Sequence, residues 1–585
     1  MTPFRVWAPK ANRVEVEIRG ERFAMTAGEG GWWFAEIASA GPNTDYAFVL
    51  DGGQPLPDPR SPWQPHGVDG PSRVVDQGSF PWTDQHWQAR PLSSALFYEL
   101  HIGTFTPEGT FKAAIEKLGY LLRLGITHVE LMPVAEFSGS RGWGYDGADL
   151  YAPHHTYGDP DDLKCLIDAC HARGLAVILD VVYNHLGPVG NYLARFGPYF
   201  TERYTTPWGE AINFDGPGSD EVRRFFCNNA LMWLRDYHYD GLRIDAVHAI
   251  IDTSAVHFLE QLACEVADLE AQSGRHLAVI AESDLNDPRV IRPQEIGGYG
   301  VHAQWSDDFH HALHCLLTEE RGGYYADFGS LADLAHALQQ AFILDGRYSA
   351  FRRRRHGKSP AGLSGHRFLG FLQNHDQIGN RAEGERSCHL MSIGRVKIGA
   401  ALVLTAPFVP MLFQGEEWGA SSPFLYFTDH EDPALGRAVT EGRRREFAAF
   451  GWNPKDVPDP QARETFERSK LNWNERDQEP HAELLAWHRR LIQLRREIPV
   501  LSDGRMERVH VSFDETAKWL VVTRAPVVIA CNLSAVEQRV PTGSGNDSEL
   551  LLASETKIQI TQDSIELPPD SVAILQSTRS NYSRT

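Results

Sequence analysis

The pattern of hydrophobic and polar positions divides the chain into three stretches. In residues 1–90, short runs alternate hydrophobic with polar residues or gather aromatic residues, and Gly, Pro and Asn separate them. Alternation with a period of two is typical of β-strands that bury one face. The runs are FRVWAP (4–9), RVEVEIRG (13–20), GGWWFAEI (30–37) and DYAFVL (45–50). This stretch is predicted to form a β-sandwich that ends in the proline-rich segment 55–67, which cannot continue a central strand.

Residues 91–499 have a different pattern, in which strongly apolar runs alternate with helical periodicity. The runs are ALFYELHI (95–102), HVELMPV (128–134), LAVILDVVYNH (175–185), DGLRIDAV (240–247), LAVIAES (277–283), the weaker VHAQWSD (301–307), RFLGFLQNHD (367–376) and APFVPMLFQGEE (406–417). Continuous apolar strands joined by helices imply a parallel sheet that is covered on both faces. Eight such strands predict an α/β fold, a closed (β/α)8 TIM barrel with insertions.

Within the barrel region, the sequence predicts the position of two helices and of one long loop. The segment 111–125 is predicted to be one helix, and its apolar stripe consists of Phe111, Ile115, Leu118 and Leu122. A second helix begins after Asp159 as N-cap, has Pro160 in its first turn and stops at Gly174. Residues 186–218 show neither period and are expected to form a loop.

From about residue 500 the pattern returns to short β runs. They are VHVSF (509–513), KWLVVTR (518–524), PVVIACNLS (526–534), KIQI (557–560) and SVAIL (571–575). The sequence therefore predicts an N-terminal β-sandwich (1–90), a barrel (91–499), a C-terminal β-sandwich (500–577) and a disordered tail (578–585).

Charge and cysteine content narrow the function classes. The formal net charge is −21 at pH 7, which argues against nucleic acid as a partner. For the basic run FRRRRHGK (351–358) we favour a solvated loop over a binding patch. The seven cysteines are scattered without a C-x-x-C pair, and no apolar run reaches the roughly 18 residues of a membrane helix. We therefore expect a cytoplasmic protein with no membrane partner; nothing in the sequence indicates its oligomeric state.

Acidic and polar residues interrupt the ends of several apolar runs, which is where barrel enzymes place their active sites. The third run supplies Asp180, Asn184 and His185, the fourth Arg243 and Asp245, the fifth Glu282, and the seventh His375 and Asp376. Three carboxylates, Asp245, Glu282 and Asp376, should thus converge on one rim. Packing alone does not select such a group, because uncompensated buried charge is costly. Paired carboxylates in a cleft are the requirement of glycoside hydrolysis.

The stretch GLRIDAVH (241–248) explains how two of these groups would be presented. If it is a strand, Leu242 and Ile244 face the surrounding helices, while Arg243 and Asp245 point into the barrel. Charge pairing with Arg243 would then keep Asp245 ionised.

The other polar candidates have two interpretations each. Asp180 either supports a neighbouring side chain or touches substrate, and for Asn184 a loop-closing amide is favoured over a calcium ligand. His185 and His375 are either internally satisfied histidines or contacts to sugar hydroxyl groups. Trp143 and Tyr145, in RGWGYDG (141–147), are either sugar-stacking platforms or core residues.

The motifs DVVYNH, GLRIDAVH, AES and QNHD, in this order, resemble the four signature regions of the α-amylase family, glycoside hydrolase family 13. The resemblance implies that Asp245 is the nucleophile, Glu282 the general acid/base and Asp376 a transition-state stabiliser. It also implies substrate contacts by Arg243, His185 and His375, with Tyr145 as a stacking platform. Because the family retains anomeric configuration, the carboxyl groups of Asp245 and Glu282 should lie about 5 to 5.5 Å apart.

Longer stretches resemble the branch of this family that hydrolyses maltooligosyltrehalose. They are YELHIGTFTPEGTF (98–111), RGWGYDGADLYAPHHTYG (141–158), FLQNHDQIGNRA (371–382) and LFQGEEWGASSPF (412–424). This resemblance implies cleavage of the α-1,4 bond next to a terminal trehalose unit, without a cofactor; calcium is left open and no metal ligand set is predicted.

Alternatives and gaps also follow from the sequence. A branching or debranching enzyme shares the signature motifs, and the N-terminal FRVWAPKANRVEV (4–16) resembles the β-sandwich of that branch. A non-catalytic glucan-binding protein is disfavoured because all three carboxylates are present. For the site that would hold trehalose, Trp305, Asp307 and Trp418 are candidates that could equally be scaffold.

Overall fold

The central part of the chain is a closed barrel of eight parallel strands, as the apolar runs predicted. The computed structural model describes residues 2–449, 453, 456–543 and 548–577. In barrel order the strands are β9 (Phe97–Leu100), β10 (His128–Leu131), β13 (Ala176–Val181), β16 (Gly241–Ile244), β17 (Ala278–Ala281), β18 (Ala303–Trp305), β21 (Phe368–Gly370) and β22 (Val409–Phe413). Parallel pairing of β22 with β9 closes the barrel.

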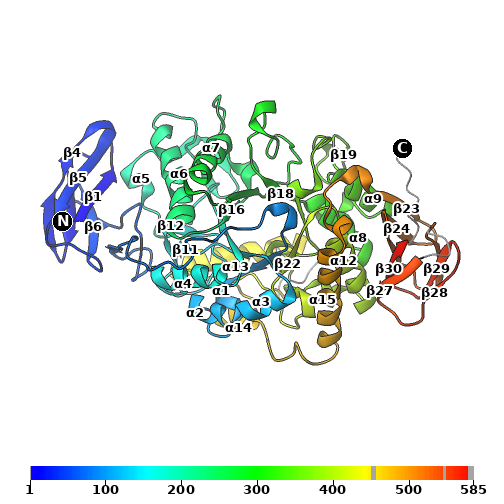
Figure 1. Ribbon diagram of the computed structural model, residues 1–585. Helices are drawn as coiled ribbons and strands as arrows, with labels where there is room; N and C mark the ends of the chain where they lie inside the picture. The colour runs from blue at the N-terminus through cyan, green and yellow to red at the C-terminus, as the bar shows by residue number, and fades with distance from the viewer. Residues whose placement is uncertain (1, 450–452, 454–455, 544–547, 578–585) are drawn as a thin grey trace.

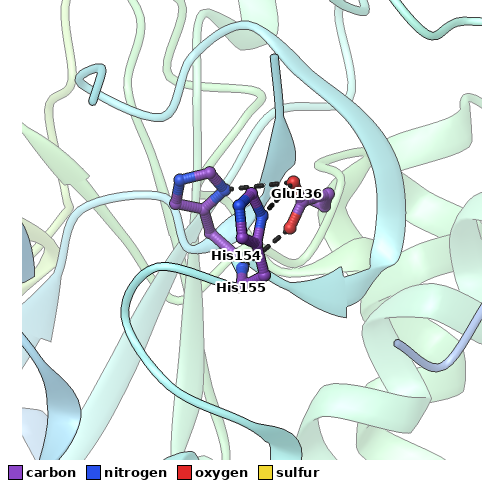
Figure 2. Close-up of side chains that lie close together, drawn as sticks. All are labelled: Glu136, His154 and His155. Atoms are coloured by element: carbon purple, nitrogen blue, oxygen red, sulfur yellow. Dashed lines mark hydrogen bonds and ion pairs between the residues drawn. The ribbon is translucent and has the colours of Figure 1, made fainter. Parts of the chain in front are cut away.

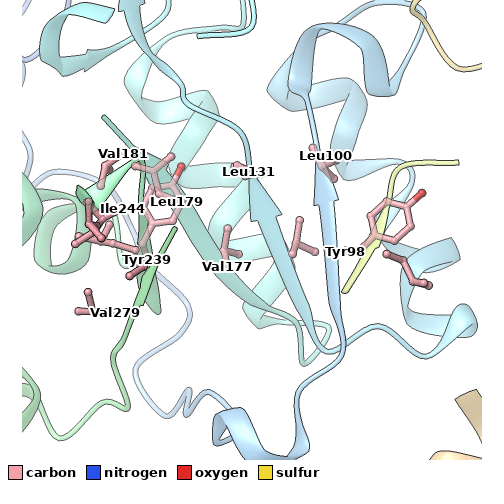
Figure 3. Packing of buried hydrophobic residues seen from close by; sticks show 14 of the residues in the cluster. Tyr98, Leu100, Leu131, Val177, Leu179, Val181, Tyr239, Ile244 and Val279 are labelled. Carbon is pink, nitrogen blue, oxygen red and sulfur yellow. The ribbon is translucent and has the colours of Figure 1, made fainter. Parts of the chain in front are cut away.

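Side chains of the barrel strands alternate between two separate cores. The smaller core takes every second residue of several strands, for example Phe97, Ile178 and Met411, and fills the barrel interior. The larger core combines the intervening residues with the helices, and Figure 3 shows Leu179, Ile244 and their neighbours on this outer side. Leu242 and Ile244 belong to this larger core, so the predicted alternation around Arg243 is confirmed.

Helices surround the barrel (Figure 1). The longer ones are α4 (Pro160–His171), α6 (Ser219–Asp236), α7 (Phe258–Ser273), α8 (Asp307–Thr318), α9 (Leu331–Gln340), α12 (Ile393–Thr405), α13 (Pro433–Ala449) and α15 (His481–Glu497). The shorter ones are α1 (Ile102–Phe105), α2 (Phe111–Ile115), α3 (Leu118–Leu124), α5 (Leu193–Phe196), α10 (His375–Gly379), α11 (Ser387–Leu390) and α14 (Arg463–Arg468).

The predicted caps of α4 are confirmed. The Asp159 side chain accepts a hydrogen bond from the Asp162 amide at 2.8 Å, and Pro160 is the first helical residue. Gly174 has a φ of +79°, the left-handed conformation that glycine adopts without strain at a helix end.

The prediction of a single helix over residues 111–125 is wrong. The helix is interrupted after Ile115 and resumes at Leu118, which shifts the phase of the second half. Leu121 is consequently buried, whereas Leu122, which belongs to the predicted stripe, is 44% exposed. A stripe read at constant period fails wherever the helix breaks.

The stretch 186–218, expected to be a loop, also contains regular structure. It holds α5 and an antiparallel hairpin of β14 (Phe200–Thr206) and β15 (Gly209–Ile212). The hairpin turn presents Trp208, whose side chain is 48% exposed.

A second insertion follows β10 and forms the hairpin of β11 (Ala135–Phe137) and β12 (Gly147–Pro153). Its connecting segment, residues 138–146, contains Trp143 and Tyr145. A third, smaller hairpin pairs β19 (Tyr348–Ser349) with β20 (Arg354–Arg355), and β20 lies within the basic run 351–358.

Residues before the barrel form two sheets, in the orders β1-β5-β4 and β3-β2-β6-β7, with β8 added to β6. The strands are β1 (Thr2–Trp7), β2 (Val14–Ile18), β3 (Glu21–Ala24), β4 (Thr26–Ala27), β5 (Trp32–Ile37), β6 (Asp45–Leu50), β7 (Pro55–Leu56) and β8 (Ser72–Arg73). All four predicted runs are strands, and the proline-rich segment contributes only the edge strand β7.

Residues after the barrel form two further sheets, β23-β24-β25-β30-β27 and β26-β29-β28, at the opposite end of the molecule (Figure 1). The strands are β23 (His510–Asp514), β24 (Trp519–Arg524), β25 (Val527–Asn532), β26 (Gln538–Pro541), β27 (Ser548–Ala553), β28 (Gln559–Ile560), β29 (Ser564–Leu567) and β30 (Ser571–Ser577). The predicted domain boundaries stay predictions, and the tail 578–585 lies outside the described residues.

Two further observations concern membrane-spanning helices and disulfide bonds, neither of which the sequence predicted. Within the described part of the chain, no helix combines the length and apolar character needed to cross a membrane. All seven cysteines are free thiols, as their scattered spacing predicted.

Candidate active site

A completely buried arginine, Arg243, organises the carboxyl-terminal rim of the barrel. Its Nη1 donates to both oxygens of Asp180, at 2.7 and 2.8 Å, and to Oδ1 of Asp245 at 3.0 Å. Its Nη2 lies 3.4 Å from Oε2 of Glu282, and its guanidinium stacks 4.1 Å above the ring of Trp305. One positive charge therefore joins three carboxylates that come from three neighbouring strands.

Asp245 follows β16 and is fixed from a second side by Asn184. The amide of Asn184 donates to Oδ2 of Asp245 at 2.8 Å and to its main-chain carbonyl at 3.2 Å. These contacts favour the positioning role of Asn184 over that of a calcium ligand. With one oxygen held by Arg243 and the other by Asn184, the orientation of the Asp245 carboxylate is set before substrate binds.

The residue after Asp245 is strained in a way that links it to Glu282. Ala246 has φ +40° and ψ +51°, a left-handed conformation that is costly for a residue with a Cβ atom. In this conformation its amide donates to Oε2 of Glu282 at 2.6 Å. The strained turn therefore holds the second carboxylate relative to the first.

Glu282 follows β17 and combines partial exposure with a perturbed acidity. Burial raises the pKa of Glu282, and although Arg243 opposes this effect, the negative charges of Asp245 and Asp376 add to it. The side chain keeps 16% of its surface exposed, so a ligand can reach it. A carboxyl group with a raised pKa next to a paired carboxylate is the arrangement that general acid catalysis requires.

Asp376 reaches the same region from an element that was not predicted. The motif QNHD was expected at the end of a strand, but β21 ends at Gly370 and Asp376 lies in the first turn of α10. Asn374 caps this helix by accepting the amides of Asp376 and Gln377 at 2.9 and 3.1 Å. The Asp376 side chain is 39% exposed, and its Oδ1 accepts a hydrogen bond from the Asn380 amide at 3.3 Å.

His375 is buried between two carboxylates, one of which the sequence analysis missed. Its Nδ1 donates to Glu99 of β9, and its Nε2 lies 3.5 Å from Asp376. Burial alone would lower the pKa of His375, but Glu99 and Asp376 raise it to about 9. Glu99 is an acidic residue within the apolar run ALFYELHI, which is the same kind of sequence signal that identified Asp180 and Arg243.

This charged histidine predicts a specific pH dependence of stability. Because the pKa of His375 rises from 6.5 to about 9 on folding, its stabilising effect is complete below pH about 6.5 and is lost as the pH rises through 9. We expect the difference in unfolding free energy between the wild type and His375→Gln to shrink by about 3 kcal/mol over this range. Urea denaturation of both proteins at several pH values measures it. A constant difference would contradict the charged state.

Tyr145 and Trp143, which are two residues apart in one motif, have different environments. The Tyr145 hydroxyl donates to Oδ2 of Asp180 at 2.6 Å, and its ring stacks on His375 with centroids 5.1 Å apart. Trp143 packs on Phe424 in a hydrophobic cluster, and its indole N–H donates to the Leu425 carbonyl at 2.9 Å. The structure therefore places Tyr145 at the rim and favours the scaffold interpretation for Trp143.

Asp180 and His185 complete the set of candidates. Asp180 supports Arg243 and Tyr145, and burial raises its pKa to about 7 although Arg243 opposes the shift. His185 stacks on Trp208 of the β14–β15 hairpin, with centroids 4.5 Å apart and an angle of 4° between the rings. Sequence reasoning missed Trp208 because the hairpin carries no clear alternation.

The basic run 351–358 folds over the loop that follows Glu282. Nη2 of Arg352 pairs with Asp284 at 3.0 Å, and Nε2 of His356 contacts the Asp284 carbonyl at 2.7 Å. Phe351, beside them, is 48% exposed. The run is therefore neither a fully solvated loop nor a patch of free cations, since part of it anchors a loop of the site.

Two hollows share Tyr324 and are lined in part by residues close in sequence to Asp376 and Glu282. One is lined by residues that include Asp284, Asp307, Phe351 and Arg352. The other has a volume of about 250 Å³ and is lined by residues that include Gln377, Asn380 and Arg381, next to Asp376.

The three residues considered for binding trehalose, Trp305, Asp307 and Trp418, lie in different environments. Trp305 is buried beneath Arg243, and Trp418 is fully buried with its N–H donating to Glu475 at 3.3 Å, so both are scaffold. Asp307 lines the first hollow; burial raises its pKa well above the usual range, and Glu282 adds to the effect.

Comparison with known proteins places the chain in a family. The α-amylase catalytic domain matches residues 27–204, and DUF3459, a domain of unknown function, matches residues 504–574. A malto-oligosyltrehalose trehalohydrolase of Mycobacterium tuberculosis is 50% identical over 99% of both chains. One of Saccharolobus solfataricus is 44% identical over 96% of both.

Solved structures agree with this placement. A putative α-amylase of Salmonella typhimurium superimposes with a TM-score of 0.90, at 41% identity over 98% of this chain and 97% of that one. A pullulanase of Anoxybacillus, at 18% identity and a TM-score of 0.72, shares the fold. This chain is a glycoside hydrolase of the α-amylase family and belongs to its malto-oligosyltrehalose trehalohydrolase branch.

Proposed function

We propose that the enzyme hydrolyses the α-1,4-glucosidic bond next to the terminal trehalose of maltooligosyltrehalose and releases trehalose. The observation that carries the chemistry is the buried Arg243 joining Asp180, Asp245 and Glu282 at the rim, with Asp376 beside them. The substrate rests on relatives of that name, which cover nearly the whole chain.

In the first step, Asp245 attacks the anomeric carbon of the glucosyl unit while Glu282 donates its proton to the glycosidic oxygen. The bond from the anomeric carbon to that oxygen breaks, its electron pair stays on the oxygen, and neutral trehalose leaves. The glucan remains bound to Asp245 as an ester. The Arg243 guanidinium, 3.0 Å from Asp245, stabilises the negative charge that the attack requires.

In the second step, Glu282, now ionised, takes a proton from water, and the resulting oxygen nucleophile attacks the same anomeric carbon. The ester bond breaks, Asp245 regains its negative charge and Glu282 its proton. Two displacements at one carbon retain its configuration. The spacing of about 5 to 5.5 Å between the two carboxyl groups stays a prediction of this mechanism.

The remaining rim residues are assigned to the sugar at the cleavage point. Tyr145 offers an aromatic face whose position is fixed by Asp180 and His375. Asp376, 39% exposed, is assigned to accept hydrogen bonds from ring hydroxyl groups. This lowers the barrier because the contacts tighten as the sugar flattens in the transition state. His375 and His185 supply further polar contacts there.

Replacing Glu282 by glutamine gives a sharp prediction about proton transfer. Because the pKa of Glu282 is raised, the wild type should keep its acid protonated to higher pH and lose activity as the pH rises past that value. Glu282→Gln should lose this basic limb and about 100- to 10,000-fold in kcat on natural substrate. With an aryl α-glucoside, whose leaving group needs no proton, the rate of the first step should fall far less in this variant than it does with the natural substrate. Equal losses on both substrates would contradict the assignment.

We assign the trehalose end to the surface around the small hollow of about 10 Å³ lined by Asp284, Asp307, Phe351 and Arg352; the disaccharide would lie over this hollow, with Phe351 beneath it. Asp284 follows Glu282 by two residues, and Asp307 is close enough for the charge of Glu282 to act on it. Phe351 offers an exposed aromatic face beside the paired Arg352 and Asp284. Stacking combined with hydrogen bonds is how proteins bind neutral sugars. This assignment also gives the basic run 351–358 a function.

Two rivals are weaker. A 1,4-α-glucan branching enzyme of Photobacterium profundum is 32% identical but aligns with only 54% of this chain. A non-catalytic glucan-binding protein would not need a strained residue such as Ala246 to hold Glu282 against Asp245.

A comparison of substrates tests the proposal. Maltooligosaccharide, its trehalose-capped counterpart and a branched α-1,6 glucan are supplied separately, and free trehalose, reducing ends and branch points are followed. We expect trehalose release confined largely to the capped substrate. Chain transfer into branches, cleavage of α-1,6 bonds, or inactivity on all three would each overturn it.

A cytoplasmic location also stays our proposal. It is supported by seven free cysteines, two of them exposed, which an oxidising compartment would not favour.

A further inference from the structure

A cluster outside the catalytic rim joins two histidines and a glutamate. Glu136 lies in β11, and His154 and His155 directly follow β12, the partner strand of the same hairpin. Their ligand atoms all lie within 4.8 Å of one another. Figure 2 shows both imidazole rings turned towards the Glu136 carboxylate.

His154 is the unexplained member of this cluster. Its side chain has no exposed surface. Its Nδ1 lies 3.3 Å from Oε1 of Glu136, but neither ring nitrogen makes a well-aligned hydrogen bond to the residues that the structure describes. Its ring lies flat on Phe137 with centroids 3.7 Å apart, which fixes its orientation. A buried polar group without a good partner is destabilising, and a bound ion is one way in which a native protein satisfies it.

The geometry suits a metal ion better than a shared proton. Oε1 of Glu136 lies 3.3 Å from Nδ1 of His154 and 2.8 Å from Nδ1 of His155. Donor atoms around a tetrahedral ion with bonds of 2.0–2.1 Å lie about 3.3 Å apart. One pair of donors is already at this spacing, and the other needs to open by about half an ångström, which the half-buried His155 can provide.

The second carboxylate oxygen supports this arrangement. Oε2 of Glu136 accepts the main-chain amide of His155 at 2.8 Å, which fixes the carboxylate and leaves Oε1 to face the two imidazoles. Partners that orient a ligand in this way are a regular feature of metal sites.

We propose that Glu136, His154 and His155 form a binding site for a divalent transition metal of the zinc class. Two imidazole nitrogens and one carboxylate oxygen match the preference of Zn²⁺, and the fourth position is open towards solvent beside His155, which is 29% exposed. The ion lies away from Arg243 and takes no part in bond cleavage.

The consequence for the enzyme is mechanical. Glu136 in β11 and the two histidines after β12 lie at the base of the hairpin, where Ala135 pairs with Pro153. The segment that connects the two strands, residues 138–146, carries Tyr145, whose hydroxyl donates to Asp180. A metal that binds the folded chain more tightly than the unfolded one stabilises the fold by mass action. The bound ion should therefore make this hairpin more resistant to unfolding and hold Tyr145 in place.

Metal titration of the full chain tests the proposal. After treatment with a chelator, the protein is titrated with Zn²⁺ by calorimetry and with Co²⁺ by its visible absorption. We expect one site in the wild type. Binding should be more than about tenfold weaker in His155→Ala and Glu136→Gln. His276→Ala is the matched control, because His276 also contacts a glutamate, at 3.5 Å, but is 63% exposed and outside the cluster.

The unaltered chain provides an independent readout. Crystals soaked in Zn²⁺ should show an anomalous peak between the three ligand atoms, and Zn²⁺ should raise the melting temperature of the wild type but not of His155→Ala. Absence of binding, equal binding in all variants, or a peak elsewhere only would overturn the proposal.

Discussion

Asp245→Asn should lower kcat by at least about 10,000-fold while leaving the fold intact. The substitution keeps the shape of the side chain but removes the negative charge that attacks the anomeric carbon, so no ester intermediate can form. The amide can still occupy the position between Arg243 and Asn184, 3.0 and 2.8 Å away in the wild type. Steady-state kinetics on capped substrate and thermal unfolding measure the two effects separately.

A matched control shows that the loss comes from the site. Asp477→Asn makes the same chemical change at a side chain that is 73% exposed and should keep full activity. If Asp245→Asn retained activity within a factor of ten of the wild type, with its fold unchanged, Asp245 would not be the nucleophile.

Arg243→Met is expected to have the largest effect on stability. It removes the positive charge between Asp180, Asp245 and Glu282 and leaves these carboxylates close together in a buried region. Breaking a buried ion pair by removing one partner typically costs 3–5 kcal/mol. Activity should fall as well, because without the positive charge the neighbouring carboxylates favour protonation, and Asp245 then loses the negative charge that it needs as nucleophile. Urea denaturation and kinetics at neutral pH measure both effects.

A double variant separates electrostatics from packing. In Asp180→Asn/Arg243→Met one of the unpaired charges is gone, so stability should partly recover while activity stays low. Arg243→Lys should also be impaired, because an ammonium group cannot reproduce the contacts that one planar guanidinium makes to several carboxylates. Arg243→Met with unchanged stability would show that the arginine does not hold the carboxylates together.

Residues in the strands were predicted well because strands of this barrel are buried on both faces. Their sequences are continuous apolar runs, so a polar residue within or just after a run is conspicuous. Asp180, Arg243, Asp245 and Glu282 were found in this way. Glu99 has the same signal in the first strand, where it is an acidic residue in a buried apolar run.

Positions in loops and short helices were harder to predict, because no fixed period governs them. Asp376 was expected at a strand end and lies in α10, because the buried Phe371 and Leu372 continue the apolar run beyond Gly370, where β21 ends. Trp143 and Tyr145 share one motif and pack against the same hydrophobic cluster, yet only Tyr145 directs a polar group, its hydroxyl, to Asp180. Only the fold decides between such neighbours.

Contacts between segments that are distant in the sequence could not be predicted from it. Arg352 pairs with Asp284, and Trp208 stacks on His185, because separate insertions meet above the barrel. Pairings of this kind depend on three-dimensional proximity that composition and periodicity do not encode.

The central claim is that Asp245 and Glu282 release trehalose by retaining hydrolysis, and proton NMR of a reaction with trehalose-capped maltooligosaccharide tests it most directly. We predict that trehalose and new glucan reducing ends appear in equal amounts, and that these ends form first as the α-anomer before mutarotation. A β-anomer as first product, or reducing ends without trehalose, would contradict the account.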